Sequence, residues 1–170
     1  EGVQSQLDEE PGFTVAAWQQ RPESRGWVRL KTGDPFDKPE INPNYLDDEL
    51  DRQLVVSAIK LARRMMHAPA MARYLDHEVY PGIDRGQTDD ELLDIARERG
   101  TSTYHMMGTC RMAPADDRTA VVDHGLRVHG LSGLRVADTS IMPTMLSANL
   151  NAGAIMIGDK AADLVRGRTL

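Results

Sequence analysis

The chain changes character at Gly100. Beyond it, short apolar runs at 120–123, 126–128 and 134–136 are set off by glycines, a pattern typical of short strands. A helical pattern over 151–166 follows them. Strands this short need neighbours from a sheet with more strands than this segment supplies. The sequence therefore predicts that the segment after Gly100 completes a larger fold and does not form one alone.

A hairpin is predicted near the start of the chain. Residues 13–18 form an apolar run, and residues 27–31 alternate polar and apolar side chains as a half-exposed strand does. Turn-forming residues lie between the two runs. Residues 32–46 contain three prolines and are expected to be irregular, and the polar residues 1–12 are expected to be a flexible start.

A long helix is predicted to begin at Asp47 or Asp48, since either suits the N-cap position, and to end before Pro69. Its apolar residues recur at helical spacing and are expected to form a buried stripe: Leu50, Leu54, Ala58, Leu61 and Met65. A short helix is expected around residues 69–75.

A further helix is predicted to begin at Thr88, because Thr88 and Glu91 have the spacing of a capping box. Its apolar side is expected to consist of Leu92, Leu93, Ile95 and Ala96. Gly100 is expected to close this helix in the left-handed conformation that glycine adopts easily.

Composition excludes several classes of protein. Of the 170 residues, 41% are apolar and 27% are charged, which is the balance of an ordinary globular protein. The net charge of −6 disfavours nucleic-acid binding through a basic surface. A run of about 18 apolar residues, which a membrane span requires, is absent. The first residues lack the basic and apolar regions of a signal peptide, so a cytoplasmic location is expected.

Three segments carry the residues on which a chemical function depends. They cover residues 104–112, 133–143 and 147–163. In this order and spacing they resemble the C-terminal part of the glucose–methanol–choline (GMC) oxidoreductases, which are flavoproteins that oxidise alcohols. Residues 21–30 and 42–46 look like the substrate-domain segment of the same family. The resemblance thus covers nearly the whole chain.

The resemblance implies a fold of two parts that combines α+β and α/β architecture. Residues 1–112 would mostly build a substrate-binding domain, an antiparallel sheet flanked by helices. Residues 113–170 would complete a Rossmann-like FAD-binding domain. The G-x-G-x-x-G fingerprint of such a domain is absent from this chain. The implied partner is therefore an N-terminal FAD-binding portion, in the same polypeptide or a separate chain. The oligomeric state stays open, a homo-oligomer included.

His105 is the candidate catalytic base for the oxidation of a primary alcohol to an aldehyde. Alcohol oxidation requires removal of the hydroxyl proton as a hydride leaves the carbon, and an imidazole titrates near neutral pH. Of the five histidines, only His105 lies in a segment that has few charges and contains glycine. The resemblance implies the same role, although the family often has a proline directly after this histidine, where this sequence has Met106.

Asn149 matches the family's second catalytic position, which holds His or Asn. Its amide can both donate to and accept from a substrate hydroxyl. The alternative is that Asn149 merely caps the last helix. Asn151 and Ala152 would open that helix, and the resemblance implies that this end faces the flavin pyrimidine ring, where free N–H groups favour negative charge.

Asp138 and Thr139 occupy a position that the family uses near the FAD diphosphate. A carboxylate does not attract a phosphate, so their backbone N–H groups are expected to make the contact while the Asp138 side chain braces the loop. The alternative is an ordinary aspartate at a strand end.

Other readings of the same residues are weaker. Cys110, the single cysteine, excludes an internal disulfide and a zinc finger built on cysteines, and it is more typical of a buried, inert thiol than of a nucleophile. A zinc site that combines Cys110 with His105, His124 and His129 lacks ligand spacing. Two rival functions remain: an FAD-containing lyase or other non-oxidising relative on the same fold, and a non-enzymatic interaction fragment.

Overall fold

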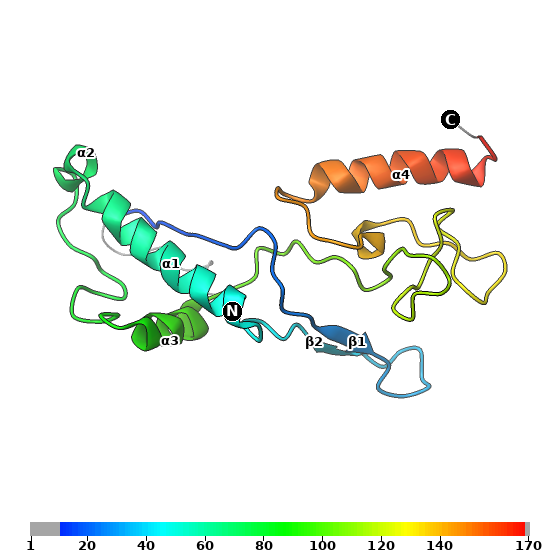
Figure 1. The fold of residues 1–170 in the computed structure, drawn as a ribbon, viewed down its shortest axis with the longest axis horizontal. Helices are drawn as coiled ribbons and strands as arrows, with labels where there is room; N and C mark the ends of the chain where they lie inside the picture. The colour runs from blue at the N-terminus through cyan, green and yellow to red at the C-terminus, as the bar shows by residue number, and fades with distance from the viewer. Residues whose placement is uncertain (1–10, 169–170) are drawn as a thin grey trace. The chain divides into compact units, whose positions relative to one another are not determined.

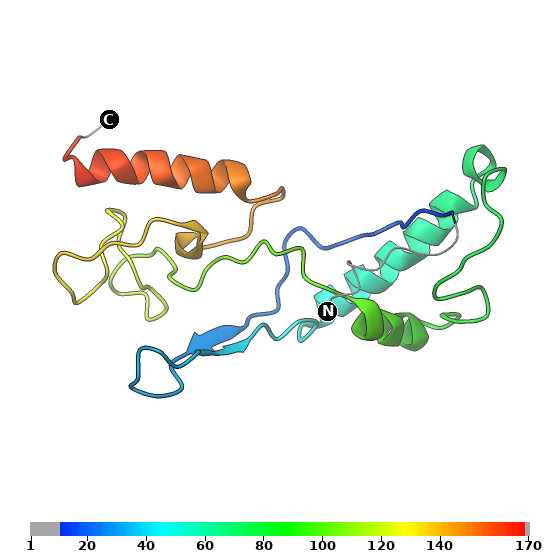
Figure 2. The ribbon, with the colours of Figure 1, turned by 180° about the vertical axis from the view of Figure 1, so that it is seen from behind.

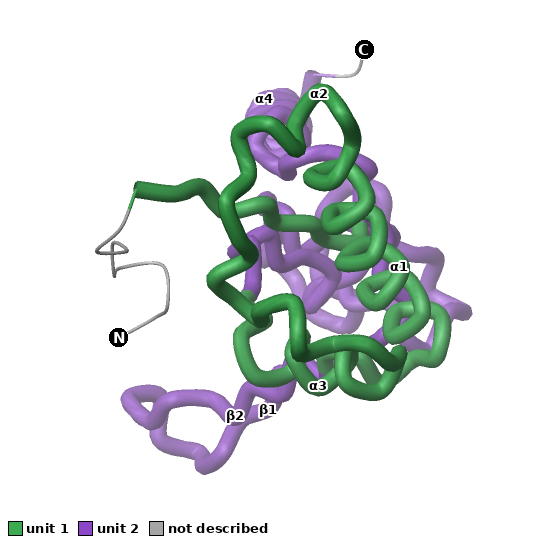
Figure 3. Tube along the Cα trace, turned by 90° about the vertical axis from the view of Figure 1, so that its left-hand side faces the viewer, with its two compact units in different colours: residues 1–19, 45–101 green, residues 20–44, 102–170 purple. Residues whose placement is uncertain are grey.

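The computed structural model describes residues 11–168, and the chain divides into two compact units (Figure 3). Unit 1 consists of residues 1–19 and 45–101, and unit 2 consists of residues 20–44 and 102–170. Of the predicted flexible start, residues 1–10 lie outside the described residues. The predicted domain boundary after residue 112 concerns the complete protein and stays a prediction.

Unit 1 is helical, with α1 (Glu49–Met66), α2 (Pro69–Ala72) and α3 (Asp89–Arg99) in chain order (Figure 1). The Asp48 carboxylate accepts the N–H of Leu50 at 2.8 Å and caps α1, while Pro69 begins α2. The three predicted helices are therefore confirmed.

The capping box of α3 is confirmed, but the predicted conformation of Gly100 is wrong. The Thr88 Oγ1 accepts the Glu91 N–H at 3.3 Å, and the Glu91 carboxylate accepts the Thr88 N–H at 3.1 Å. Gly100 has a φ of −61° and a ψ of 142°, so it is extended and not left-handed. A Cβ at this position would clash with the Ala96 carbonyl oxygen. Glycine is required here for space rather than for handedness.

The core of unit 1 lies between α1 and α3, which run side by side (Figure 2). Its buried members are Val56, Leu92 and Ile95. The predicted buried stripe of α1 is wrong, because four of its members are 41–57% exposed: Leu50, Leu54, Leu61 and Met65. The reason is that α3 covers the face of α1 that carries Val56. No described residue of unit 1 buries the other apolar face.

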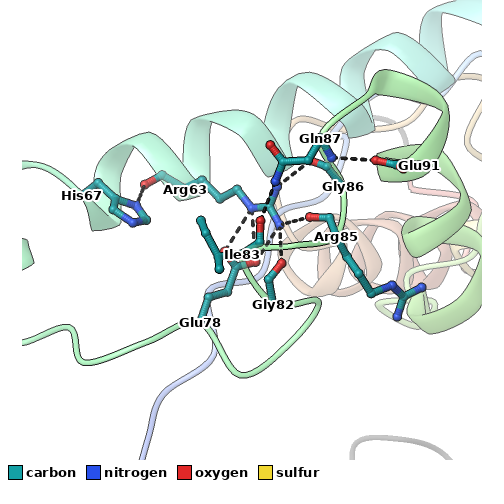
Figure 4. Close-up of polar contacts among 9 residues, drawn as sticks. All are labelled: Arg63, His67, Glu78, Gly82, Ile83, Arg85, Gly86, Gln87 and Glu91. Atoms are coloured by element: carbon teal, nitrogen blue, oxygen red, sulfur yellow. Dashed lines mark hydrogen bonds and ion pairs between the residues drawn. The ribbon is translucent and has the colours of Figure 1, made fainter.

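Arg63, near the end of α1, fixes the loop that precedes α3 (Figure 4). Its guanidinium donates to the Glu78 carboxylate at 2.9–3.1 Å. It also donates to the carbonyl oxygens of Gly86 at 2.7 Å, Arg85 at 2.8 Å and Gly82 at 3.3 Å. Because a planar guanidinium carries five N–H donors, this one side chain can bond to the carboxylate and to all three carbonyl oxygens of the loop.

Unit 2 begins with a hairpin of β1 (Trp27–Arg29) and β2 (Glu40–Asn42), paired antiparallel with Trp27 opposite Asn42. The predicted partner strand, 13–18, is wrong, since those residues have no regular structure. The prolines of 32–46 exclude a helix but not a short strand, and so β2 forms within the stretch expected to be irregular. Gly26 permits the pairing, because a Cβ there would clash with the Asn42 carbonyl oxygen.

The remainder of unit 2 is mostly irregular and packs beneath α4 (Asn151–Val165). The three predicted strands are reduced to isolated bridges, in which Val122 pairs with Met112 and Val128, and Arg127 pairs with Arg135. The buried core of this part consists of Val122, Leu126, Ile141, Met142, Leu150, Ile157 and Ala161. The predicted final helix is confirmed and ends one residue before the expected position.

The predicted fold class is confirmed in its coarser form, because the described residues combine one small antiparallel sheet with helices. Among residues 11–168, no helix has both the length and the apolar character needed to cross a membrane.

The turn that begins at Asp123 gives unit 2 a predicted dependence on acid. The backbone N–H groups of Arg127 and Gly125 donate to the Asp123 carboxylate at 2.8 Å each, and they hold its pKa below the usual range. A carboxyl pKa that is lower in the folded state stabilises that state above the unfolded pKa, about 3.9, and the stabilisation is lost as pH falls through the folded value. Hydrogen exchange should therefore show the Gly125 and Arg127 amides keeping their protection down to about pH 4 and losing it as the pH falls below that value. Asp123→Asn, whose neutral amide oxygen still accepts, should show a smaller loss. An equal loss in both proteins would contradict this account.

The exposed apolar faces predict that the chain is not self-sufficient. Leu54 and Leu61 on α1 are 41% and 45% exposed, and Ile155 on α4 is 66% exposed. Expressed alone, the chain should bind an apolar dye and lack a cooperative thermal transition in near-UV circular dichroism. Leu54→Lys combined with Leu61→Lys should lower dye binding, whereas the core change Leu92→Ala should not. A sharp transition with a resolved near-UV spectrum would show that the chain folds independently.

Candidate functional site

The segment that follows His105 is held against the 3-10 turn η2 (Thr139–Ile141) by backbone hydrogen bonds. The N–H of Cys110 donates to the Ser140 carbonyl oxygen at 2.9 Å, and the N–H of Met112 donates to that of Ile141 at 2.8 Å. A longer bond of 3.4 Å joins the Gly108 N–H to the Thr139 carbonyl oxygen. Two of the three segments singled out in the sequence are thereby brought together.

The turn η2 is stabilised by side chains at its start. The exposed Asp138 accepts the N–H of Ser140 on Oδ1 at 2.8 Å, so its carboxylate does brace the loop. The Thr139 hydroxyl donates to the Met106 carbonyl oxygen at 3.1 Å. The backbone N–H groups of Asp138 and Thr139 have no acceptor within residues 11–168. They remain available to an anion.

His105 lies on a backbone that is constrained on both sides. Before it, Tyr104 has a φ of 60°, and its N–H donates to the Ser102 hydroxyl oxygen at 2.9 Å. After it, Met106 is tied to Thr139. The ring itself is half-buried and has no hydrogen bond within the described part of the chain. A left-handed conformation is costly for a residue with a Cβ, and such strain clusters at functional sites.

Asn149 is exposed and stands two residues before α4. The alternative that it caps this helix is wrong, because the N-cap is Leu150 and no side chain provides a capping hydrogen bond. Leu150 is buried in the unit 2 core, on which the partly buried Met107 also packs. Met107 is two residues after His105, and Leu150 directly follows Asn149, so both site residues lie next to side chains of one shared core. No hydrogen bond joins His105 to Asn149 in the structure of residues 11–168.

The start of α4 differs from that of the other long helices in the described chain. Both α1 and α3 have a side-chain cap and acidic residues in the first turn, and α4 has neither. The first N–H groups of α4, at Asn151 and Ala152, thus find no protein acceptor among the described residues. An uncapped helix N-terminus carries partial positive charge and favours a negative group.

Other candidates do not gather into a second centre. Within residues 11–168, no carboxylate forms a hydrogen bond with His129, whose Nε2 lies 3.1 Å from the Ala113 carbonyl oxygen. Within residues 11–168, no three histidine, cysteine or acidic side chains lie where they could hold a metal ion. A pocket of about 190 Å³ beside Arg85 and Glu91 in unit 1 contains none of the predicted site residues.

Sequence reasoning missed the role of the Thr139 side chain and the strained Tyr104. The Thr139 hydroxyl reaches a carbonyl 33 positions away, so no local pattern could indicate the bond. The positive φ of the tyrosine could not be predicted from the sequence either, because the left-handed conformation is typical of glycine, asparagine and aspartate.

Comparison with known proteins identifies the family of this chain. The family model described as GMC oxidoreductase matches residues 22–158. The chain is 46% identical, over 158 residues, to the oxygen-dependent choline dehydrogenase of Cronobacter sakazakii. The aligned region covers 93% of this chain and 28% of that protein. It thus spans less than a third of the length of this curated relative.

Two solved structures share the fold. A fungal aryl-alcohol oxidase superposes with a TM-score of 0.76 and 35% identity over 86% of this chain and 24% of that one. An FAD-dependent oxidoreductase from Chaetomium thermophilum superposes with a TM-score of 0.78 and 34% identity over 87% of this chain and 25% of that one. The matched motifs, the family model and these neighbours agree, and the chain belongs to the GMC oxidoreductase family.

Proposed function

We propose that this chain is the C-terminal portion of an FAD-dependent oxidoreductase that oxidises a primary alcohol to an aldehyde. The observation that carries the proposal is the backbone pairing of the His105 segment with the turn at Asp138 and Thr139. This pairing joins the segment that carries His105 to a turn whose first backbone N–H groups have no acceptor within residues 11–168. The names of the relatives, a choline dehydrogenase and an aryl-alcohol oxidase, support an alcohol as substrate.

The residues present fit a bound FAD. The backbone N–H groups of Asp138 and Thr139 have no acceptor in the described chain and suit a diphosphate oxygen. The uncapped start of α4, at Asn151 and Ala152, suits the electron-rich side of the flavin ring. When bound, FAD supplies the hydride acceptor, flavin N5. The N-terminal portion of the protein would supply the remaining contacts, including the G-x-G-x-x-G turn that this chain lacks.

His105 would accept the proton of the substrate hydroxyl. A neutral imidazole nitrogen is a competent acceptor near pH 7, and the absence of a ring hydrogen bond within residues 11–168 leaves both nitrogens available. The half-buried setting limits the water that competes for the substrate. The constrained backbone on both sides limits how far the ring can move away from its acceptor position.

Asn149 would orient the alcohol. Its side chain is exposed and has no hydrogen bond within the described residues, so its amide donor and acceptor are free for a substrate. An amide is neutral at every pH of interest. It can therefore hold a hydroxyl toward His105 without altering the charge near the base.

The function is tested by mixing the full-length protein with alcohols in the absence of oxygen. Choline and a benzylic alcohol are the first substrates to use, given the names of the relatives. Bleaching of the flavin absorbance band is the expected result. A protein that binds FAD without bleaching would support the lyase or other non-oxidising alternative. A protein with no flavin band would support the interaction fragment.

His105→Ala should leave the FAD content unchanged and slow anaerobic flavin reduction by about 10²–10⁴-fold, the usual contribution of a general base. Stopped-flow absorbance measures this rate directly. The matched control is His77→Ala, because His77 is exposed and, within residues 11–168, its side chain bonds only to the neighbouring Asp76. Reduction at the original rate in the His105 variant would show that the histidine is not the base.

Substitutions of Asn149 should separate substrate positioning from a general effect on the fold. Asn149→His keeps a donor and an acceptor and should reduce flavin more slowly than the original protein but faster than Asn149→Asp. The aspartate places a negative charge beside the substrate oxygen, where negative charge develops as the hydroxyl proton leaves, and the two like charges repel. Because the side chain forms no cap, thermal stability should be nearly level across the three proteins. A fast Asn149→Asp variant would contradict the positioning role.

A further inference from the structure

The hydroxyl of Thr139 links the turn η2 to the segment that carries His105 through a side-chain hydrogen bond. It donates to the Met106 carbonyl oxygen at 3.1 Å, across 33 positions of the chain. The other links between these segments are backbone bonds that any sequence could form, and the first of them, from Gly108 to Thr139, is long at 3.4 Å. The Thr139 hydroxyl therefore strengthens the pairing at its weakest end, which is the end nearest His105.

The position of this bond matters because of what surrounds His105. Tyr104 is in a left-handed conformation with a φ of 60°, which costs energy for a residue with a Cβ. The Ser102 hydroxyl holds the N–H of Tyr104 on one side, at 2.9 Å. The bond to Met106 holds the peptide that follows His105 on the other side. If the bond to Met106 is lost, the strained backbone at Tyr104 can relax to a lower-energy conformation and shift His105 with it.

We infer that the Thr139 side chain is a positioning residue for His105, in addition to the cofactor contact expected of the Thr139 backbone. The inference rests on the proposed function, in which His105 is the base. One residue would then serve two groups: its N–H faces the cofactor, and its hydroxyl fixes the peptide that carries the base. This arrangement couples the location of the base to the location of the cofactor, and their separation controls the rate of a step that needs both.

The test compares Thr139→Val with Thr139→Ser in the full-length protein. Valine keeps the shape and removes the donor, whereas serine keeps the donor and removes a methyl group. Thr139→Val should slow anaerobic flavin reduction by roughly 3–10-fold, the factor that corresponds to one net hydrogen bond. Its FAD content should stay unchanged, and Thr139→Ser should restore most of the rate. Thr103→Ala is the matched control, because Thr103 is exposed, lies two residues before His105 and has no side-chain hydrogen bond within residues 11–168.

A readout that does not depend on activity is hydrogen exchange in the substrate-free protein. Exchange of the Gly108 and Cys110 amides should rise several-fold in Thr139→Val and stay near the original rate in Thr139→Ser. Unchanged exchange together with an unchanged reduction rate would overturn the inference. Loss of FAD from Thr139→Val would also overturn it, because the side chain would then serve the cofactor and not the base.

The double variant distinguishes failure of this inference from failure of the proposed function. In a His105→Ala background, Thr139→Val should have no further effect on the reduction rate, since no base remains to be positioned. An equal slowing in both backgrounds would overturn the positioning role and leave His105 as the base. A His105→Ala protein that reduces at the original rate would overturn the role of His105 as the base, and with it this inference, whereas a full-length protein whose flavin no alcohol reduces would overturn the proposed function itself.

Discussion

The backbone pairing between residues 108–112 and the turn η2 is the interaction on which the rest of unit 2 depends. Three N–H groups of one segment donate to three consecutive carbonyl oxygens of the other. These bonds satisfy polar groups that would otherwise be costly to bury, because Ile141 and Met142 lie in the core directly beside them. Packing of α4 on this pair then covers the apolar side.

This arrangement explains how a segment with almost no regular structure can hold a site. Single hydrogen bonds to exposed loops contribute little, but several bonds that share one core act together. Each of the three site residues lies within three positions of a buried or partly buried side chain. Asp138 and Asn149 are themselves exposed, and His105 is half-buried. Rigid apolar anchors with free polar tips are what a binding or catalytic loop requires.

The exposed apolar faces occur in a chain that spans 28% of the length of a curated relative. The stripe of α1 retains its helical spacing in the sequence although no described residue of unit 1 covers it. An amphipathic face is evidence of a partner surface and gives no information about whether that surface belongs to the same segment.

Local chemistry was sufficient to predict the helices from the sequence. A capping side chain lies within three residues of the N–H group that it accepts, so a local pattern is enough to predict the caps at Asp48, Thr88 and Glu91. The motif residues could also be identified, because their spacing along the chain is itself the signal of the family. The strands could not be predicted in the same way. Residues 13–18 have strand-forming composition, but pairing is decided by the partner, and Gly26 admits residues 40–42 instead.

Tertiary structure alone decided which of the chosen residues act together. It joined Thr139 to Met106, a contact that no local pattern indicates because the two are 33 positions apart. It also made the buried Leu150, and not the exposed Asn149, the N-cap of α4. The sequence by itself thus determined the residue types, the helices and the family. Distances between remote residues, and hence the geometry of the site, come only from the packing that brings the segments together.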